Sequence, residues 1–211
     1  MTTGAIITAR MKSIRLPGKM MIDIGGKPLL QHVVDGVKKA RKLDKVIVAT
    51  TVNSPEIVTY CQEHNILCYA GSENDILTRL YTSAVWQELD FIVRVWGDSI
   101  WITGALIDCA VVEYQICDTD GMTYLSVKDN YSDYWVAVMS FKLLEKAYRE
   151  VVDPANREWI HKYLSNPNDI TRHTPRLILM DYSISAGYHT IDTKEDLERE
   201  RKWYERSKAT S

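Results

Sequence analysis

Short apolar runs alternate with amphipathic segments along residues 5–116, and this alternation constrains the fold of the chain more than any other feature. Runs with the length and composition of buried strands stand at Ala5–Thr8, Lys45–Thr50, Leu67–Tyr69 and Phe91–Trp96. Segments with the spacing of amphipathic helices separate them. We therefore expect an α/β fold, in which a mostly parallel sheet is flanked by helices on both faces and connected by right-handed crossovers.

The intervening helices are predicted from apolar periodicity and from residues that favour helix ends. They are expected at Lys27–Leu43, Ser54–Asn65, Glu73–Gln87 and Ala105–Ile116. Ser54, which is followed by Pro55, and Ser72 are the expected N-caps of the second and third helices. Lysines and an arginine crowd positions 38–42 at the end of the first helix, where cations suit the helix dipole.

The second half of the chain has a less regular pattern than the first. Strands are expected at Tyr134–Ser140, Leu177–Tyr182 and Tyr188–Ile191, and helices at Phe141–Val151, Asn156–Leu164 and Lys194–Ser207. Thr193 is the expected N-cap of the last of these helices. Residues 118–185 are accordingly expected to form a small irregular lobe beside the main sheet.

Composition and charge argue against some classes of binding partner and some cellular locations. The net charge is −2, and the absence of a basic excess argues against a nucleic acid held by phosphate neutralisation. The apolar runs are too short to cross a membrane, and the N-terminus lacks the pattern of a signal peptide. The cysteines form no C-x-x-C pair and are expected to be reduced thiols: Cys61, Cys68, Cys109 and Cys117. These features predict a cytoplasmic protein.

A cluster of cations follows the first predicted strand directly. The cationic residues are Arg10, Lys12, Arg15 and Lys19, in a loop that also contains Pro17 and Gly18. Convergent cations and backbone N–H groups at the carboxyl end of a strand suit a polyanion such as a triphosphate. The loop lacks the G-x-x-x-x-G-K-[ST] pattern of a P-loop. A solvated charged loop is the structural alternative.

Asp98 stands where a carboxylate could face the same ligand, because it follows Gly97 at the end of a predicted strand. A carboxylate in such a position can ligate a divalent ion that carries phosphate oxygens. The structural alternative is a turn aspartate. Asp192 precedes the last predicted helix, and its segment by itself indicates only a helix start with acidic residues in the first turn.

The segment A-R-x-x-S-x-R-L-P-G-K, followed by D-I-G-G-K-P-L-L, resembles the opening of the CMP-sugar synthetases. These include the 3-deoxy-manno-octulosonate and acylneuraminate cytidylyltransferases, and the strongest likeness is to their short relatives, the spore-coat polysaccharide cytidylyltransferase-like family. The resemblance runs over nearly the whole chain and implies a Rossmann-like nucleotide-diphospho-sugar transferase fold. It also implies that Arg10 and Lys19 are catalytic and hold the phosphates of CTP, with Ala9, Ser13 and Arg15 beside them.

Further segments match the family in the same order. The strand ending in G-D and the I-D-T-x-E-D-L-E-R segment imply that Asp98, also catalytic, and Asp192 bind Mg²⁺. By the same resemblance, nucleotide contacts are expected at Thr50, in the V-A-T-T segment, and at Ser72 and Arg79, in the G-S-E-N-D-I-L-T-R segment. The D-P-x-x-R-E segment carries the candidate acceptor contacts, which are Arg157 and Glu158.

The function that the resemblance implies is Mg²⁺-dependent transfer of CMP from CTP to an acidic sugar or related acceptor. Pyrophosphate would be released, and the product would serve surface glycan or polysaccharide synthesis. The chain would be one cytidylyltransferase domain, with a nucleotide-binding half (1–117), an acceptor and dimerisation lobe (118–185) and a C-terminal part carrying the metal aspartate (186–211). A homodimer is expected because relatives dimerise.

Two other functions remain open from the sequence. One is a nucleotidyltransferase that uses a phosphorylated acceptor other than a sugar, such as a polyol, an amino acid or a phosphonate. The other is a nucleotide-binding protein without turnover. Ser99-Ile100-Trp101 favours the second of these, because it stands where the family has Cys-Pro or Glu-Pro after the metal aspartate.

Overall fold

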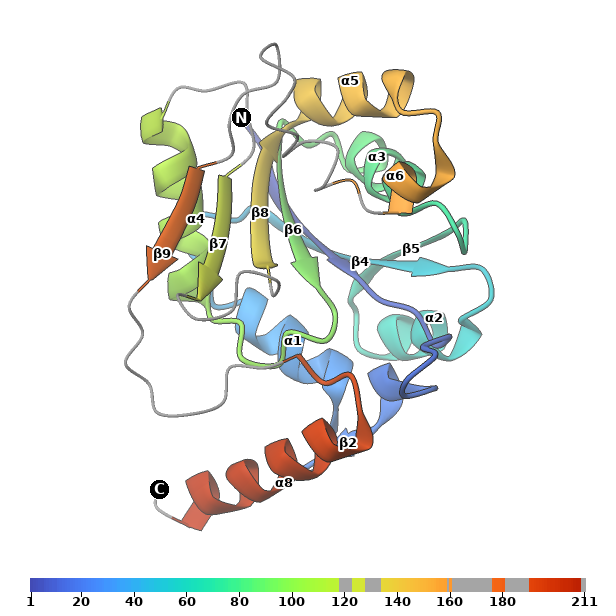
Figure 1. Cartoon of the computed structure of the whole chain (residues 1–211), viewed down its shortest axis with the longest axis vertical. Coiled ribbons are helices and arrows are strands. Elements are labelled where there is room, and N and C mark those ends of the chain that lie inside the picture. Colours follow the sequence, from blue (N-terminus) through green and yellow to red (C-terminus); the bar gives the residue numbers. More distant parts are fainter. Residues whose placement is uncertain (118–122, 128–133, 159, 161–175, 181–189, 210–211) are drawn as a thin grey trace.

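The computed structural model describes residues 1–117, 123–127, 134–158, 160, 176–180 and 190–209. Its centre is a seven-stranded sheet with the order β5-β4-β1-β6-β8-β7-β9 (Figure 1). The strands are β1 (Thr3–Thr8), β4 (Lys45–Thr51), β5 (Leu67–Gly71), β6 (Phe91–Trp96), β7 (Thr123–Val127), β8 (Tyr134–Ser140) and β9 (Arg176–Met180). β8 is antiparallel to β6 and β7, and the remaining neighbours pair in parallel. The mostly parallel sheet predicted from the sequence is therefore confirmed.

Strands from the second half of the chain extend the sheet that the first half begins. β8 pairs with β6, and β7 and β9 follow it outward. Main-chain pairing thus joins the described strands of residues 118–185 to the central sheet. β7 was not predicted. The division of the chain into three functional parts stays a prediction.

Helices cover both faces of the sheet. They are α1 (Leu29–Val37), α2 (Pro55–Glu63), α3 (Ile76–Trp86), α4 (Gly104–Cys117), α5 (Phe141–Glu150), α6 (Pro154–Glu158) and α8 (Lys194–Ala209). A short 3₁₀ helix η1 (Lys19–Met21) and a small hairpin of β2 (Asp23–Ile24) and β3 (Lys27–Pro28) precede α1. α8 contacts β2 at one end of the molecule (Figure 1).

Alternating side chains along the strands form two cores, one on each face of the sheet. In β1, Ala5 and Ile7 pack with apolar residues of α1, α2 and α4, whereas Ile6 packs with those of α3 and α5. This alternation follows from the two-residue period of a strand. Because both faces are buried, the strands need apolar residues at successive positions, which explains the continuous apolar runs in the sequence.

The first helix ends earlier than its periodicity predicts. α1 stops at Val37, so the cations at positions 38–42 lie in the following loop and not in the last helical turn. The backbone N–H groups of Arg41 and Lys42 donate instead to the carboxylate of Asp108 in α4, at 2.9 and 2.8 Å. A carboxylate from another helix thus satisfies backbone donors beyond the helix end, which local sequence alone does not reveal.

Of the three predicted N-cap residues, only Thr193 caps its helix through its side chain. Thr193 caps α8, since its hydroxyl accepts from the N–H of Asp196 at 3.1 Å while the Asp196 carboxylate accepts from the N–H of Thr193 at 2.9 Å. Ser72 does not cap α3, which begins at Ile76 and is capped by Asp75. Ser54 precedes α2 as predicted, but its hydroxyl accepts from the N–H of Met11 at 3.0 Å and so fastens the loop after β1.

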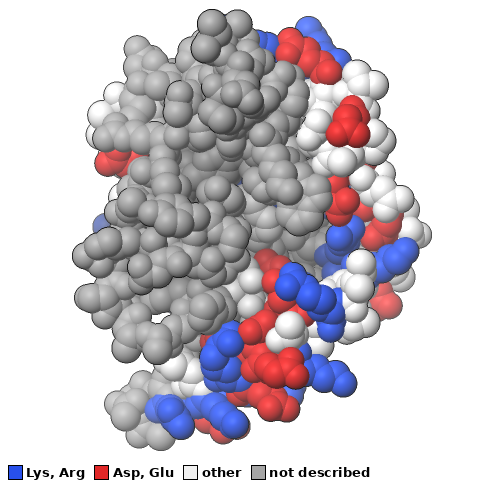
Figure 2. Space-filling model, in the orientation of Figure 1, with Lys and Arg blue, Asp and Glu red and all other residues white. Residues whose placement is uncertain are grey.

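No helix in the described ranges is long and apolar enough to cross a membrane. Cys61, Cys68 and Cys109 are free thiols, and the side chain of Cys117 lies outside the described residues. Figure 2 shows cationic and anionic side chains interspersed over α8 at the lower end of the molecule, consistent with the near-neutral net charge.

Candidate active site

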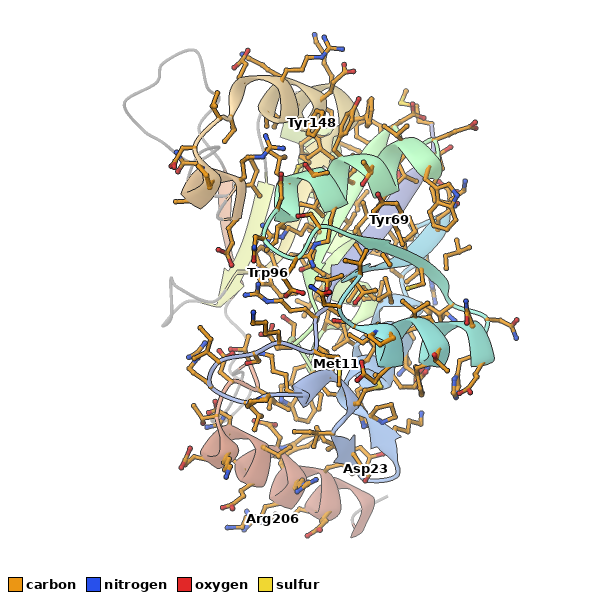
Figure 3. All side chains as sticks on the ribbon, turned by 90° about the vertical axis from the view of Figure 1, so that its right-hand side faces the viewer. Met11, Asp23, Tyr69, Trp96, Tyr148 and Arg206 are labelled. Atoms are coloured by element: carbon orange, nitrogen blue, oxygen red, sulfur yellow. The ribbon has the colours of Figure 1, made fainter. Side chains whose placement is uncertain are left out.

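A cavity of about 380 Å³ opens at the carboxyl ends of β1 and β6, where a parallel sheet places its ligands. It is lined by Thr8, Ala9, Arg10, Ser13, Ile14, Arg15, Lys19, Met20, Ile76, Arg79, Arg94, Trp96, Gly97, Asp98, Glu158 and Asp192. In Figure 3, Trp96 lies between α3 and the loop that carries Met11. The cavity therefore brings together most of the residues singled out in the sequence.

The loop after β1 folds on itself and turns Lys19 toward the cavity. The N–H groups of Ser13 and Gly18 both donate to the carbonyl oxygen of Met11, at 3.0 and 2.9 Å. Gly18 has a φ of +73°, a left-handed conformation that glycine adopts readily. Leu16 is buried, and its N–H donates to the Ser13 hydroxyl at 3.3 Å. Local turns thus fix this cationic loop.

Lys19 joins the two candidate metal aspartates. Its Nζ donates to Asp98 Oδ2 at 2.6 Å and to Asp192 Oδ1 at 2.9 Å. Burial disfavours the charge on the Lys19 ammonium, but Asp98 and Asp192 outweigh that effect and raise its pKa. Burial likewise acts to raise the pKa of Asp192, but its hydrogen bond to Lys19 and the nearby cations lower it. The three side chains therefore form one charged unit.

The carboxylates fit a divalent metal ion carried by a nucleotide. Asp98 Oδ1 is buried and has no hydrogen-bond partner among the described residues. Asp192 Oδ2 is also engaged, by Arg15 at 2.8 Å and by the Thr190 hydroxyl at 3.1 Å. Mg²⁺ commonly takes one or two carboxylates and completes its shell with waters and phosphate oxygens. The described residues contain no cluster of three or more His, Cys, Asp or Glu side chains that could hold a metal ion.

Backbone contacts bring the two aspartates to the same place. Gly97 donates its N–H to the Thr8 carbonyl oxygen at 3.0 Å, and a Cβ at Gly97 would lie 2.7 Å from that oxygen. Only glycine therefore lets the turn after β6 approach β1 this closely. The N–H of Ile191 donates to the carbonyl oxygen of Asp98 at 3.3 Å, which joins the segment before α8 to the same turn.

Trp101 takes part in an anchor that the sequence did not predict. Its Nε1 donates to Oε2 of the buried Glu200 at 2.8 Å, and its ring meets the edge of Trp203 with centroids 4.0 Å apart. Both partners come from α8. The residue that stands in place of the family's proline pair is therefore fixed by a tertiary contact, which holds the turn after Asp98 against the helix after Asp192.

Arginines gather at the part of the cavity formed by α3 and β6. Arg79 is 1% exposed, and burial together with the nearby Arg10 lowers its pKa to about 10. Arg94 is 3% exposed, and its guanidinium carbon lies 4.2 Å from the centre of the Trp96 ring. Arg10 Nη2 donates to Glu158 Oε1 at 3.3 Å. The sequence did not single out Arg94, although an arginine within a buried apolar strand is an available signal.

Other predicted site residues lie apart from the cavity lining. Thr50 is fully buried at the end of β4, and Ser72 is exposed before α3. Arg157 binds Asp75 through Nε at 2.8 Å and the carbonyl oxygen of Val151 through Nη1 at 2.7 Å. Arg157 thus ties α6 to the start of α3. The roles expected for these residues stay predictions.

A parallel sheet with a cationic loop after its first strand, facing two carboxylates at the same edge, defines a Rossmann-like nucleotidyltransferase. The model of the family described as cytidylyltransferase matches residues 4–174. The chain belongs to the cytidylyltransferase family. The resemblance read from the opening motif is therefore confirmed, as is the expected class of enzyme.

Individual relatives agree with this membership. The chain is 34% identical over 166 residues to an uncharacterized protein of Methanocaldococcus jannaschii, covering 77% of this chain and 67% of that protein. It is 29% identical over 157 residues to a 3-deoxy-manno-octulosonate cytidylyltransferase of Hydrogenovibrio crunogenus, covering 73% of this chain but only 58% of that relative. The solved structure of a cytidylyltransferase from Leptospira borgpetersenii is similar with a TM-score of 0.82 and 26% identity, covering 94% of this chain and 84% of that one.

Proposed function

We propose that this protein transfers CMP from CTP to an acidic sugar or related acceptor, with release of pyrophosphate and dependence on Mg²⁺. The observation that carries the proposal is the joint placement of Lys19, Asp98 and Asp192 at the cavity beyond β1 and β6. A lysine between two carboxylates suits a triphosphate, because the lysine can pair with phosphate oxygens and the carboxylates can bind the metal ion that accompanies them. The choice of CTP as the nucleotide is inferred from the family, and the residues that would bind it are those that line the cavity.

The chemistry asks for positioning and charge neutralisation. The oxygen of an acceptor hydroxyl attacks the α-phosphorus of CTP and its proton passes to water, while the bond from that phosphorus to the bridging oxygen breaks and pyrophosphate leaves. Lys19, Arg10 and Arg15 would hold the phosphate oxygens, with Ala9 and Ser13 in the same loop. When bound, Mg²⁺ would neutralise charge on the phosphates, and Asp98 and Asp192 would hold it.

The binding of a triphosphate requires Lys19 to exchange partners. The Lys19 ammonium bonds one oxygen of each carboxylate, Asp98 Oδ2 and Asp192 Oδ1, so these two oxygens become available to a metal only when Lys19 turns to the phosphates. The exchange would leave each charged group with an opposite charge beside it, since the metal would replace the lysine at the carboxylates while the lysine meets the phosphates. Lys19 would then stabilise the negative charge that develops on pyrophosphate.

The remaining assignments extend the same proposal. Thr50 and Ser72 would contact the nucleotide, and Arg157 and Glu158 the acceptor, as the resemblance implies. Glu158 lines the cavity and pairs with Arg10, which supports a role for it at this site. A homodimer and a role in polysaccharide synthesis belong to the proposal as well. The hydrogen bond from Trp101 to Glu200 of α8 holds the turn after Asp98 without the family's proline, which supports turnover over the alternative of a binding protein.

Pyrophosphate release is the direct test. Wild-type protein with Mg²⁺ and a panel of sugar acids should release pyrophosphate from CTP, and CTP should raise the melting temperature more than ATP, GTP or UTP. Lys19→Gln should lower turnover at least about 100-fold, since it removes a charge that stabilises the leaving group. Lys12→Gln is the matched control, because Lys12 is an exposed cation of the same loop outside the cavity lining. Absence of both release and a CTP-dependent shift would refute the proposal.

A further inference from the structure

The part of the cavity formed by α3 and β6 carries positive charge beyond that of the loop after β1. Arg79 comes from α3 and Arg94 from β6, and both line the cavity. Both side chains are nearly fully buried, at 1% and 3% exposure. Arginines are seldom buried to this degree unless an anion accompanies them. Arg94 contacts the Trp96 ring, whereas the buried charge of Arg79 calls for an explanation that core packing does not give.

The charge on Arg79 is incompletely compensated by the protein. Its Nε and Nη1 are buried and have no hydrogen-bond partner in the described parts of the chain. The carboxylates of Glu73, Asp75 and Glu158 act on it from a distance, yet burial dominates and its pKa stays lowered, at about 10. A buried donor group without an acceptor is unfavourable. Arg79 therefore presents hydrogen-bond donors to something that enters the cavity.

These arginines lie on a different wall of the cavity from Lys19 and Arg15, which form the proposed phosphate clamp. Lys19 and Arg15 extend from the loop after β1 and meet Asp98 and Asp192. Arg79 instead belongs to the helix over the opposite core, and Arg94 stacks on Trp96 at the end of β6. In Figure 3, Trp96 lies close below α3. Arg10 stands between the two groups, since it pairs with Glu158 and also lowers the pKa of Arg79.

We propose that Arg79 and Arg94 bind the acid group of the acceptor, a carboxylate or a phosphate, and so position its attacking oxygen toward the α-phosphate held by the loop after β1. This inference rests on the proposed function and assigns Arg79 to the acceptor in place of the nucleotide contact implied by the family resemblance. Forked guanidinium donors match both carboxylate and phosphate oxygens. The two arginines form no bond to the reacting atoms, so they are binding and positioning residues.

The test measures binding of a second anion while CTP occupies the clamp. Inorganic phosphate and pyruvate, as a phosphate and a 2-oxo acid probe, are titrated calorimetrically into protein saturated with CTP and Mg²⁺. We expect one probe to bind at millimolar concentrations, and which one it is distinguishes the two acid groups. Arg79→Gln and Arg94→Gln should each weaken that binding at least about 10-fold, because each removes a charge-assisted pair. Both should change the CTP affinity by less than about 3-fold, a small part of the free energy of triphosphate binding.

The clamp variant gives the reciprocal pattern. Lys19→Gln should weaken CTP binding at least about 10-fold, while Lys12→Gln should change neither ligand. If Arg79→Gln weakens CTP binding and leaves the anion probe unaffected, Arg79 contacts the nucleotide and the inference is overturned, although the proposed function stands. Failure of both probes to bind the wild-type complex also overturns it. Loss of CTP binding in the wild type would instead refute the proposed function.

Thermal stability separates this role from a structural one. Arg79→Met removes a buried charge with incompletely satisfied donors, so the melting temperature of the unliganded variant should equal or exceed that of the wild type. The stabilisation by the anion probe should be lost in the same variant. A marked fall in melting temperature, with stabilisation by the probe retained, would assign Arg79 to the core and contradict the inference.

Discussion

At the scale of single residues, Lys19 is the cation that holds the two aspartates of the site together. It holds Asp98 at 2.6 Å and Asp192 at 2.9 Å, although these residues are 79 and 173 positions away in the chain. Without a cation between them, two partly buried carboxylates at one place would repel each other. Lys19 thus keeps these two carboxylates together.

This arrangement predicts how the protein responds to Mg²⁺ alone. Lys19→Met should lower the free energy of unfolding by about 1–3 kcal/mol, because it leaves partly buried carboxylates without their partner. Added Mg²⁺ should raise the melting temperature of the variant more than that of the wild type, since the carboxylate oxygens are then open to the metal. Lys12→Met is the control for the loss of a loop cation. Equal Mg²⁺ shifts in all three proteins would count against a metal site at these aspartates.

At the scale of elements, α3 depends on Asp75 at its start. The Asp75 carboxylate accepts from the Thr78 N–H and from Arg157 Nε, both at 2.8 Å. Burial acts to raise the pKa of Asp75, but these hydrogen bonds and the charge of Arg157 outweigh it and lower the pKa. A carboxyl group with a lowered folded-state pKa contributes stability above its unfolded-state pKa, and this contribution is lost as the pH falls through the folded-state value.

The lowered pKa of Asp75 predicts how the stability of the protein depends on pH. Asp75→Asn keeps a capping oxygen but loses the charge, so at pH 7 it should lower the free energy of unfolding by about 1–2 kcal/mol. The difference from the wild type should shrink as the pH falls below 3.8, the ordinary value, because Asp75 is then increasingly protonated. Denaturant unfolding between pH 2.5 and 7 measures it, with the exposed Glu63→Gln as control. A difference independent of pH would contradict the assigned ion pair.

α8 is the element that completes the site from the far end of the chain. Asp192 directly precedes it, and Trp101 binds its buried Glu200. Because Trp101 also follows Asp98 closely in sequence, one helix supports both aspartates. The local sequence does not reveal this contact, since the missing proline and the bulky Trp101 after Asp98 indicate only a loss of turn rigidity.

The anchor can be tested by removing its hydrogen bond. Trp101→Phe leaves the ring but strips Glu200 of a donor, which should cost about 1–3 kcal/mol of folding free energy. It should also weaken Mg²⁺-dependent CTP binding more than Mg²⁺-independent binding. Trp203→Phe is the matched control, because Trp203 contributes a ring contact and is 46% exposed. If both variants bind CTP with Mg²⁺ as the wild type does, α8 has no part in placing the aspartates.

At the scale of the whole molecule, the sequence predicts features that repeat along the chain and misses those that depend on contacts between distant segments. The strand and helix alternation predicts the sheet, and the carboxyl-end rule groups the loop after β1 with Asp98, whereas Asp192 was assigned only from the family resemblance. Ser54 stands at the start of α2 as predicted, but its hydroxyl bonds the N–H of Met11 from another segment, and α1 ends before the predicted residue. Arg94 was overlooked because strand periodicity does not distinguish a buried arginine that lines a cavity from one that is exposed.

We propose that Asp98 and Asp192 together bind the nucleotide through a divalent metal ion. Calorimetric titration of CTP with and without Mg²⁺ measures this directly. Wild-type protein should bind CTP at least about 10-fold more tightly with Mg²⁺, and Asp98→Asn and Asp192→Asn should each abolish that gain. Asp90→Asn, a change at the opposite end of β6 where the carboxylate is 55% exposed, should retain it. A Mg²⁺-dependent gain that survives in both aspartate variants would contradict the claim.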